Sequence, residues 1–257
     1  MLYFCCMDYT LKKSLGQHFL TDESICIRLV DDWRATKGSH LLEVGPGAGA
    51  LTRFLLELEE VEFKAVELDE EKVRYLLKKY PVLEGKLIHG SILDVPCPFQ
   101  VPFTLIGNFP YNISSQIVFR VLEWRDFVTV MIGMFQKEVA ERIVASPGSR
   151  IYGILSVLVQ AYYEVEYLFD VPPQSFNPPP KVMSGVIRLR RKALDVPVRS
   201  ERSFRVLVKM AFNQRRKMMR NAVKSLFSDD VLKESIFDRR AEQLSVEQFA
   251  ELTFRMK

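Results

Sequence analysis

The sequence predicts an α/β domain of the nucleotide-binding kind, followed by a small helical domain. A short buried strand, a glycine-rich turn and an amphipathic helix follow one another within Leu41–Leu58. Strand-like and helix-like segments then alternate up to about residue 190, which is typical of a sheet covered by helices on both faces. A polar linker, Ala193–Ser200, separates this part from a C-terminal stretch of different composition. We therefore expect two domains, at residues 1–192 and 193–257.

Composition indicates a folded cytoplasmic protein without a metal or a membrane anchor. The chain has 257 residues, of which 48% are hydrophobic, so it can bury a sizeable core. Its four cysteines form no C-x-x-C pair, and its three histidines form no H-E-x-x-H motif. Reduced thiols are typical of the cytoplasm. No apolar run is as long as a membrane span, and the opening MLYFCCMDYT lacks the regions of a signal peptide.

The glycine-rich turn is the first candidate ligand site. Gly45, Gly47 and Gly49 follow the predicted strand Leu41–Val44 with the spacing G-x-G-x-G, whereas the dinucleotide fingerprint is G-x-G-x-x-G. Glycine permits a sharp turn and a close approach of the ligand to the backbone. A second predicted strand ends at Glu67, about where such folds place a carboxylate on ribose hydroxyls. We expect that role for Glu67 rather than that of a solvated loop carboxylate.

An N-terminal arm, residues 1–24, precedes this unit. Its segment Leu11–Leu20, LKKSLGQHFL, is first basic and then amphipathic, and Thr21 or Asp22 can cap the helix that follows. The residues leave two interpretations of the segment open. It is either an arm that packs against helices or a lid over the ligand site.

Two further predicted strands end at the carboxyl edge of the sheet, where open α/β sheets bind ligands. The first follows a charged helix over Asp69–Tyr80, covers Lys86–His89 and leads into a loop that contains Ser91. The second covers Phe103–Gly107 and leads directly into the segment Asn108–Asn112, which reads Asn-Phe-Pro-Tyr-Asn.

That segment predicts a site for a flat base that carries an amine. Pro110 has a fixed φ and biases Phe109 toward an extended backbone, so the Phe109 carbonyl can point toward a ligand. The Asn108 side chain supplies a second acceptor, and the Tyr111 ring can stack on a flat substrate. Two acceptors and a ring suit the exocyclic amine of a nucleobase. A plain turn rich in Asn and Pro is the structural alternative.

The remainder of the large domain supplies further predicted elements and one unusual loop. We expect a helix capped by Ser114, a strand at Phe127–Phe135 that is buried on both faces, and an edge hairpin between Val165 and Arg190. The loop within this hairpin, PPQSFNPPPK, has five prolines, which exclude a helix or a central strand. We expect it to be stiff and to expose Phe176 for stacking on a base flipped out of its helix. The alternative is that Phe176 folds back into the core.

The C-terminal part contains a basic segment between residues 202 and 224. It holds eight Lys and Arg residues and no acidic residue, and its densest part is AFNQRRKMMRN. We expect a basic helix that binds RNA phosphates, because a merely solvated helix face usually mixes both charge signs. Two short helices within Val231–Phe254 are expected to complete the domain. The basic residues are Arg202, Arg205, Lys209, Arg215, Arg216, Lys217, Arg220 and Lys224.

Five motifs stand in the order and spacing of one known family. They are LKKSLGQHFL, EVGPGAGALT, NFPY, PPQSFNPPPKV and AFNQRRKMMRN. On these motifs the chain resembles the small-subunit (16S-type) rRNA adenine N6,N6-dimethyltransferases, the KsgA family. The resemblance implies a Rossmann-like methyltransferase fold with a seven-stranded sheet and a small C-terminal all-α domain. It also implies an S-adenosylmethionine-dependent enzyme that dimethylates two adjacent adenosines in the 3′-terminal hairpin of small-subunit rRNA during subunit assembly.

The resemblance implies roles for individual residues as well. Asn108 and the Phe109 carbonyl hold the target amine. Pro110 forms the turn between Phe109 and the ring of Tyr111. Tyr111 and Phe176 stack on the base. The residues implied in cofactor binding are His18, Leu20, Gly45, Gly47, Glu67, Ser91 and Asn108. The residues expected to bind RNA are Lys181, Arg215, Arg216, Lys217 and Arg220.

One position departs from the family pattern. The family commonly has Asp in the loop after the third strand, where it contacts the adenine amine of the cofactor, and this chain has Ser91 there. A hydroxyl accepts the same hydrogen bond without charge assistance, so we expect a weaker contact. Asp94, three residues later, is the alternative acceptor.

Three other interpretations of the sequence are open. The first is a large-subunit rRNA adenine methyltransferase, which the proline-rich loop and the FNQRRK run disfavour. The second is a ribosome-assembly or RNA-binding factor that keeps the fold without catalysis, which the intact NFPY motif and Phe176 disfavour. The third is a nicotinamide-dependent oxidoreductase, which the glycine spacing disfavours. For the small-subunit enzyme we expect a monomer that binds rRNA and no membrane.

Overall fold

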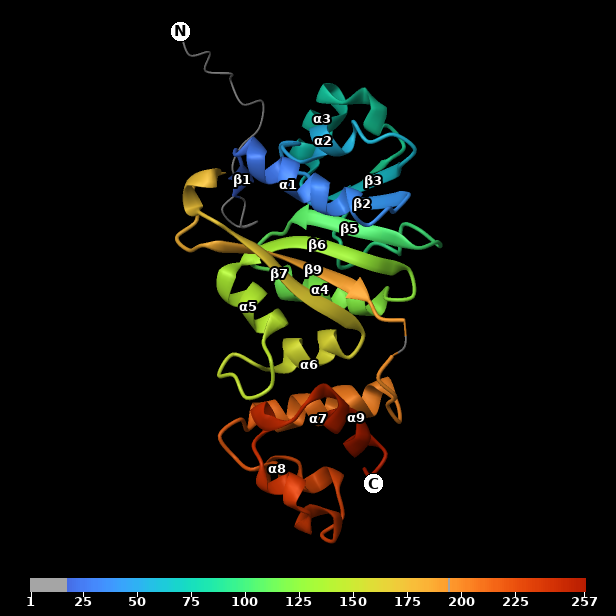
Figure 1. Cartoon of the computed structure of the whole chain (residues 1–257). Helices are drawn as coiled ribbons and strands as arrows, with labels where there is room; N and C mark the ends of the chain where they lie inside the picture. The colour runs from blue at the N-terminus through green and yellow to red at the C-terminus, as the bar shows by residue number, and fades with distance from the viewer. Residues whose placement is uncertain (1–17, 194) are drawn as a thin grey trace. The chain divides into compact units, whose positions relative to one another are not determined.

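Strands from most of the chain form one mixed sheet. This computed structural model describes residues 18–193 and 195–257, so residues 1–17 of the predicted arm lie outside the described part (Figure 1). Among the described residues, seven strands form the sheet. Their spatial order is β4 (Leu87–His89), β3 (Glu62–Glu67), β2 (His40–Val44), β5 (Phe103–Asn108), β6 (Val128–Gln136), β9 (Ser184–Arg191) and β7 (Tyr163–Val171).

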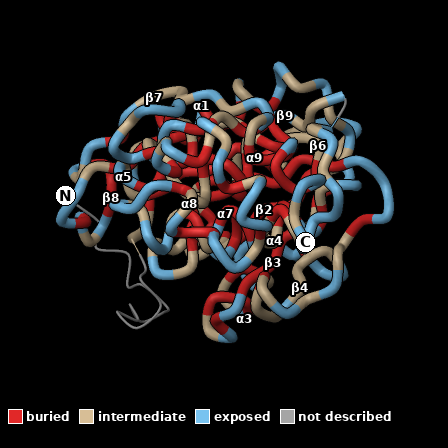
Figure 2. The backbone as a smooth tube through the Cα atoms, turned by 90° about the horizontal axis from the view of Figure 1, so that it is seen from below, coloured by how far each residue is buried: buried red, intermediate tan, exposed pale blue. Residues whose placement is uncertain are grey.

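Parallel pairing brings the carboxyl ends of the first five of these strands to one edge. β2 pairs in parallel with β3 and β5, β3 with β4, and β5 with β6. The register places Val44 beside Val66 and Asn108 beside Met134. Four of the five β2 residues and the first five residues of β5 are buried. Buried residues are drawn in red in Figure 2. Such apolar strands are typical of a parallel sheet with both faces covered.

Helices connect the strands largely where the sequence predicts them. The helices are α1 (Glu23–Arg34), α2 (Thr52–Leu55), α3 (Glu70–Lys79), α4 (Ser114–Glu123), α5 (Lys137–Val144), α6 (Ile154–Gln160), α7 (Glu201–Asn213), α8 (Met219–Ala222) and α9 (Val246–Thr253). Asp22 caps α1, and its carboxylate accepts a hydrogen bond from the Ser24 backbone N–H. α1 buries Leu29 and Trp33 in the same core cluster as Ile106 of β5.

Two local expectations are wrong. The helix expected over Ala50–Leu58 is only the four residues of α2, and no side chain caps its N-terminus. Ser114 is the first residue of α4 and not its cap, because Ile113 occupies the cap position. The Ser114 hydroxyl instead donates to the Tyr111 carbonyl at 3.1 Å.

A separate two-stranded sheet joins the arm to the proline-rich loop. β1 (Phe19–Leu20) pairs antiparallel with β8 (Phe176–Asn177), with Leu20 opposite Phe176. The Thr21 backbone N–H extends the contact by donating to the Ser175 carbonyl at 2.8 Å. This long-range pairing holds His18–Thr21 against the loop.

The described chain divides into two compact units. The first contains the residues up to Lys137 together with Tyr167–Leu189, and the second contains Glu138–Glu166 together with Arg190–Lys257. The functional division into a methyltransferase domain, 1–192, and an RNA-binding domain, 193–257, remains a prediction. Within the described part of the chain, no helix combines the length and the apolar character that a membrane crossing requires.

In the second unit, α7 packs against α6, α8 and α9. The Phe212 ring lies 6.0 Å from the Tyr152 ring and 5.8 Å from the Phe249 ring, measured between centroids. The expectation of two short α-helices near the C-terminus is wrong in part, because one α-helix, α9, forms there and the preceding segment forms 3₁₀ turns. Those turns are Lys224–Leu226, Val231–Lys233, Ser235–Asp238 and Ala241–Gln243.

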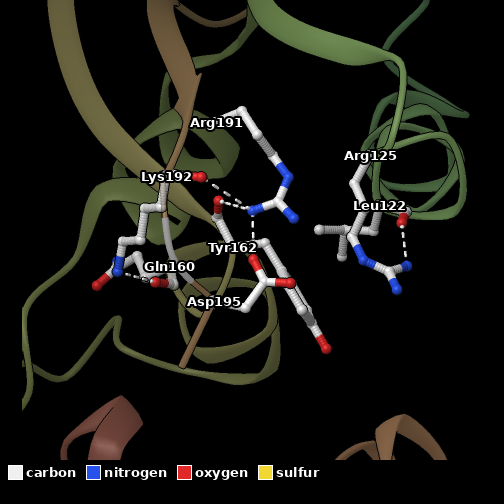
Figure 3. A network of polar contacts seen from close by, with 7 residues as sticks. All are labelled: Leu122, Arg125, Gln160, Tyr162, Arg191, Lys192 and Asp195. Atoms are coloured by element: carbon white, nitrogen blue, oxygen red, sulfur yellow. Dashed lines mark hydrogen bonds and ion pairs between the residues drawn. The ribbon is translucent and has the colours of Figure 1, made fainter. Parts of the chain in front are cut away.

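Polar contacts fix the start of the segment that leads into α7. Arg191 Nη1 donates to the Tyr162 carbonyl at 3.0 Å and forms an ion pair with Asp195 (Figure 3). Lys192 Nζ donates to the Gln160 carbonyl at 2.6 Å. These bonds hold the segment after β9 beside the end of α6.

Candidate functional site

A pocket opens at the carboxyl edge of the parallel strands. The space that it borders, including the part open to solvent, measures about 1110 Å³. All of the predicted cofactor residues line it, and so do the four residues Asn108–Tyr111. The remaining lining residues are Phe19, Glu43, Val44, Pro46, Ala48, Ala50, Leu51, Val66, Leu68, Gly90, Ile92, Asn112 and Ile113.

The glycine turn forms one wall of the pocket and requires glycine for two reasons. Gly45, Gly47 and Gly49 have φ values of +70°, +56° and +80°, a region that residues with a Cβ rarely adopt. A Cβ on Gly47 would also lie 2.8 Å from the Phe19 ring. The turn can therefore present its backbone to a ligand while Phe19 of the arm lies directly against it.

Glu67 lies at the end of β3 and stabilises the same turn. Its Oε2 accepts a hydrogen bond from the Gly47 backbone N–H at 3.0 Å, and its Oε1 accepts one from the Asp69 N–H at 2.9 Å. The side chain is buried, and burial raises the pKa of Glu67. A carboxylate oxygen has more than one acceptor site, so Glu67 can still accept hydrogen bonds from ribose hydroxyls.

Glu43 is a pocket residue that the sequence analysis did not identify. It is the fourth of the five residues of β2 and is only 2% exposed, and its Oε2 has no hydrogen-bond partner among the described residues. Burial raises the pKa of Glu43 to about 8. An acid inside an apolar strand is the signal that identifies such a group.

Asn108 is oriented by the arm. Its Nδ2 donates to the His18 carbonyl at 2.9 Å, which turns Oδ1 away as the remaining acceptor of the amide. His18 in turn contacts the proline-rich loop, with Nδ1 2.8 Å from the Pro178 carbonyl. The acceptor expected from the sequence is thus available at the pocket wall.

The Phe109 ring is packed into the core beneath the pocket. Its centroid lies 5.1 Å from that of Phe135, and the side chain is 1% exposed. A Cβ on Gly133 would lie 2.2 Å from the Phe109 ring, and a Cβ on Gly107 would lie 2.9 Å from it. Two glycines on neighbouring strands therefore make room for the ring, and the Phe109 N–H donates to the Met134 carbonyl at 3.2 Å. This packing fixes the backbone whose carbonyl is the second expected acceptor.

Ser91 lines the pocket, but its hydroxyl oxygen already has a partner. It accepts a hydrogen bond from the Leu93 backbone N–H at 3.1 Å. Asp94 is exposed and does not line the pocket. Of the two alternatives, Ser91 is therefore the residue placed for contact with a ligand.

The structure corrects the expectation for Phe176. This side chain is only 3% exposed, does not line the pocket and belongs to the same core cluster as Leu20. The reason is the pairing of β8 with β1, which directs the ring inward. Lys181 is exposed, as expected of a residue that contacts RNA, but it also does not line the pocket.

The basic segment is not one continuous basic helix, contrary to expectation. α7 ends at Asn213, and Arg215–Met218 lie between α7 and α8. Acidic residues from later in the chain contact two of the bases: Arg215 lies 3.7 Å from Glu242, and Arg220 pairs with Asp238. Arg216 and Lys217 are exposed and have no ion pair within the described chain.

Comparison with known proteins identifies relatives of the whole chain. A family model described as Ribosomal RNA adenine dimethylase matches residues 9–256. The Ribosomal RNA small subunit methyltransferase A of Flavobacterium johnsoniae is 51% identical over 252 residues, which cover 96% of this chain and 95% of that protein. Among solved structures, a dimethyladenosine transferase from Plasmodium falciparum is 25% identical with a TM-score of 0.77, covering 91% of this chain and 96% of that one.

A second solved structure is similar in fold. The 23S rRNA methyltransferase ErmE is 23% identical with a TM-score of 0.71, covering 93% of this chain and 99% of that one. At this identity the likeness shows the fold alone. Together with the seven-stranded sheet, these structures confirm the predicted Rossmann-like methyltransferase fold.

The buried acid Glu43 makes stability depend on pH. Its pKa is raised from its ordinary value to about 8, so between about pH 5 and pH 8 the folded state holds a proton that the unfolded state has released. The free energy of unfolding should therefore fall as pH rises through this range. Between these limits, the free energy of unfolding of the parent should fall by about 4 kcal/mol more than that of Glu43→Gln, as measured by denaturant unfolding.

The exposed Glu59 supplies a matched control for this experiment. Glu59→Gln should leave the pH dependence of the parent unchanged. Identical pH profiles for the parent and Glu43→Gln would contradict the assignment of a raised pKa to Glu43.

Proposed function

Because the chain belongs to the ribosomal RNA adenine dimethylase family, we propose that its pocket binds S-adenosylmethionine beside a flipped-out adenine. The chain is an rRNA adenine dimethyltransferase. We further propose that its targets are two adjacent adenosines in the 3′-terminal hairpin of small-subunit rRNA, modified during subunit assembly. The observation that supports the proposal is the setting of Asn108, which lines the pocket and donates its amide nitrogen to the His18 carbonyl, so that Oδ1 is left as an acceptor for the target amine.

The residues around the glycine turn fit such a cofactor. A backbone with three glycines at positive φ permits close approach of the methionine portion, and Glu67 offers carboxylate oxygens to ribose hydroxyls. Ser91 is placed beyond Glu67, on the loop after β4, where the cofactor's base would lie. When bound, S-adenosylmethionine supplies an electrophilic methyl group.

The chain's own contribution to the reaction is positioning and electrostatics. The lone pair of adenine N6 is shared with the ring, so the amine is a poor nucleophile. Acceptance of its two N–H groups by Asn108 Oδ1 and the Phe109 carbonyl favours a more tetrahedral nitrogen with an available lone pair. Stacking on Tyr111 would hold the base in this orientation. Both acceptors lie on one rigid strand end, so little reorganisation is required.

The exposed bases of the second unit are proposed to bind the phosphates of the rRNA. Arg216 and Lys217 are available for this role, and Lys181 of the first unit is exposed as well. Arg215 and Arg220 have acidic partners within the chain, so we propose that they stabilise the fold of the second unit more than they contact RNA. We propose that the enzyme acts in the cytoplasm, where ribosomal subunits assemble, and we retain the expectation of a monomer.

Methyl transfer tests the function directly. Purified enzyme, labelled S-adenosylmethionine and under-methylated small ribosomal subunits should give dimethyladenosine at two adjacent positions near the 3′ end, as measured by nucleoside analysis. Asn108→Ala should reduce turnover at least about a hundredfold, because the variant lacks one acceptor for the transition state. Cofactor affinity should stay within about threefold, because most pocket contacts remain.

The outcomes separate the alternatives. No transfer by the parent, with tight subunit binding retained, would indicate an assembly factor without catalysis. Transfer to large-subunit rRNA instead would indicate the first alternative, a large-subunit rRNA adenine methyltransferase. An unchanged rate in Asn108→Ala would remove Asn108 from the mechanism.

Ser91 sets a prediction for cofactor affinity. The hydroxyl oxygen already accepts the Leu93 N–H, whereas a carboxylate has a second oxygen for the adenine amine and adds charge assistance. We expect Ser91→Asp to bind S-adenosylhomocysteine about three- to tenfold more tightly, measured by calorimetric titration. Asp94→Asn, outside the pocket, should change the dissociation constant less than about twofold. Equal or weaker binding by Ser91→Asp would contradict the placement of the base at Ser91.

The two kinds of basic residue should differ in the salt dependence of RNA binding. Arg216→Gln removes one proposed phosphate-binding charge, so it should reduce the slope of log affinity against log salt by about 0.7–0.9. Arg220→Gln should leave this slope unchanged and lower stability instead, because its partner is Asp238. Filter binding of an rRNA hairpin at several salt concentrations measures both slopes. A reduced slope for Arg220→Gln with an unchanged slope for Arg216→Gln would assign the phosphate contact to Arg220.

A further inference from the structure

Ser184, the first residue of β9, makes an unusual contact with the proposed active site. Its side chain is fully buried and does not line the pocket. Its hydroxyl oxygen lies 2.5 Å from the hydroxyl oxygen of Tyr111, which does line the pocket. The two residues are 73 positions apart in the sequence, so the hydrogen bond joins the NFPY loop to the strand that follows the proline-rich loop.

We propose that Ser184 is a positioning residue that fixes the Tyr111 ring in the orientation needed to stack on the target adenine. The inference rests on the proposed function, in which Tyr111 contacts that base. Ser184 itself touches neither substrate nor cofactor in this assignment, and it acts only through the phenol.

The backbone that carries Ser184 is well fixed. β9 lies between β6 and β7 in the sheet. The preceding residue, Met183, accepts a hydrogen bond through its carbonyl from the Lys137 N–H at 2.9 Å, which ties the start of β9 to the end of β6. The Ser184 hydroxyl is thus held by the sheet and not by a mobile loop.

Tyr111 needs such an anchor because it lies in a turn. The Ile113 N–H donates to the Pro110 carbonyl, and the Ser114 hydroxyl donates to the Tyr111 carbonyl, so local bonds fix the Tyr111 backbone. None of these bonds fixes the ring, whose orientation is set by two side-chain torsions. Ser184 is the hydrogen-bond partner of the phenol in the described structure.

Removal of that partner would favour a different ring position. The Tyr111 phenol is neutral at neutral pH, and burial raises its pKa further, so the buried hydroxyl remains a donor that needs a hydrogen-bond partner. A half-buried hydroxyl without a partner is unfavourable and would draw the ring toward water. The His18 ring centroid lies 5.4 Å from that of Tyr111, at an interplanar angle of 32°. A ring that moved out would leave both this contact and the stacking position.

Steady-state methylation with a double-mutant cycle tests the proposal. Ser184→Ala should lower kcat/KM for under-methylated small subunits about tenfold, with the dissociation constant of S-adenosylhomocysteine unchanged within twofold. Tyr111→Phe keeps the ring and removes the hydroxyl that needs a partner. In the Tyr111→Phe background, Ser184→Ala should therefore change kcat/KM less than twofold, and the double variant should be more active than Ser184→Ala alone.

Ser156→Ala is the matched control. Ser156 is also a fully buried serine, and it lies in the second unit. Its hydroxyl donates to the Arg142 carbonyl and accepts a hydrogen bond from the Gly153 N–H, and both of these residues belong to the same unit. Ser156→Ala reports what the removal of a buried serine hydroxyl does through stability alone, which thermal unfolding of all variants also measures. Ser184→Thr, which keeps a hydroxyl at this position, should retain more activity than Ser184→Ala.

The outcomes distinguish this inference from the proposed function. No methyl transfer by the parent enzyme would overturn the proposed function. Transfer by the parent with equal kcat/KM in Ser184→Ala would overturn the role of Ser184 only. Equal decreases from Ser184→Ala in the parent and in the Tyr111→Phe background would show that Ser184 acts on the enzyme without the phenol, which would also overturn the proposal.

Discussion

The parallel register of β2, β3 and β5 is the constraint on which the rest of the site depends. It brings the glycine turn, Glu67 and Asn108 to one edge although they are far apart in the sequence. Hydrogen bonds in the strands fix this alignment, and burial of both faces makes a slip in register costly. A ligand that spans the edge therefore meets the turn, the carboxylate and the amide in a fixed order.

The same edge concentrates acidic and amide groups in a largely apolar wall. Glu43 and Glu67 are both buried there, yet their environments differ. Two backbone N–H groups bind the carboxylate oxygens of Glu67, whereas Glu43 Oε2 has no partner in the described chain. Burial raises the pKa of both residues. Glu67 is consequently prepared to act as an acceptor, whereas Glu43 is a buried carboxyl group whose loss of hydration the packing of the strand must offset.

The sequence predicted most features that depend on local pattern, although the length of α2 and the cap of α4 differ from the expectation, and it failed where distant segments meet. The strand–turn–helix unit and the β5–NFPY junction follow from hydrophobic periodicity and from the backbone limits of glycine and proline. The burial of Phe176 depends on its pairing with β1 near the other end of the chain, and no local signal predicts that pairing. The acidic partners of Arg215 and Arg220 likewise come from later in the chain. The absence of acidic residues between positions 202 and 224 therefore led to an overestimate of the positive charge that is free to bind RNA.

The buried Phe176 still bears on the proposed chemistry, although by a different route from stacking. Its strand pairs with Phe19–Leu20, and the adjoining His18 contacts the loop through Pro178 and Asn108 through its own carbonyl. The orientation of the Asn108 amide therefore depends on the position of the arm, and that position depends on the proline-rich loop. A stiff loop suits this purpose. Movement of the loop would shift His18 through its contact with the Pro178 carbonyl, and it would then shift the Asn108 amide through the hydrogen bond to the His18 carbonyl. The prolines thus contribute to the proposed active site without touching the pocket.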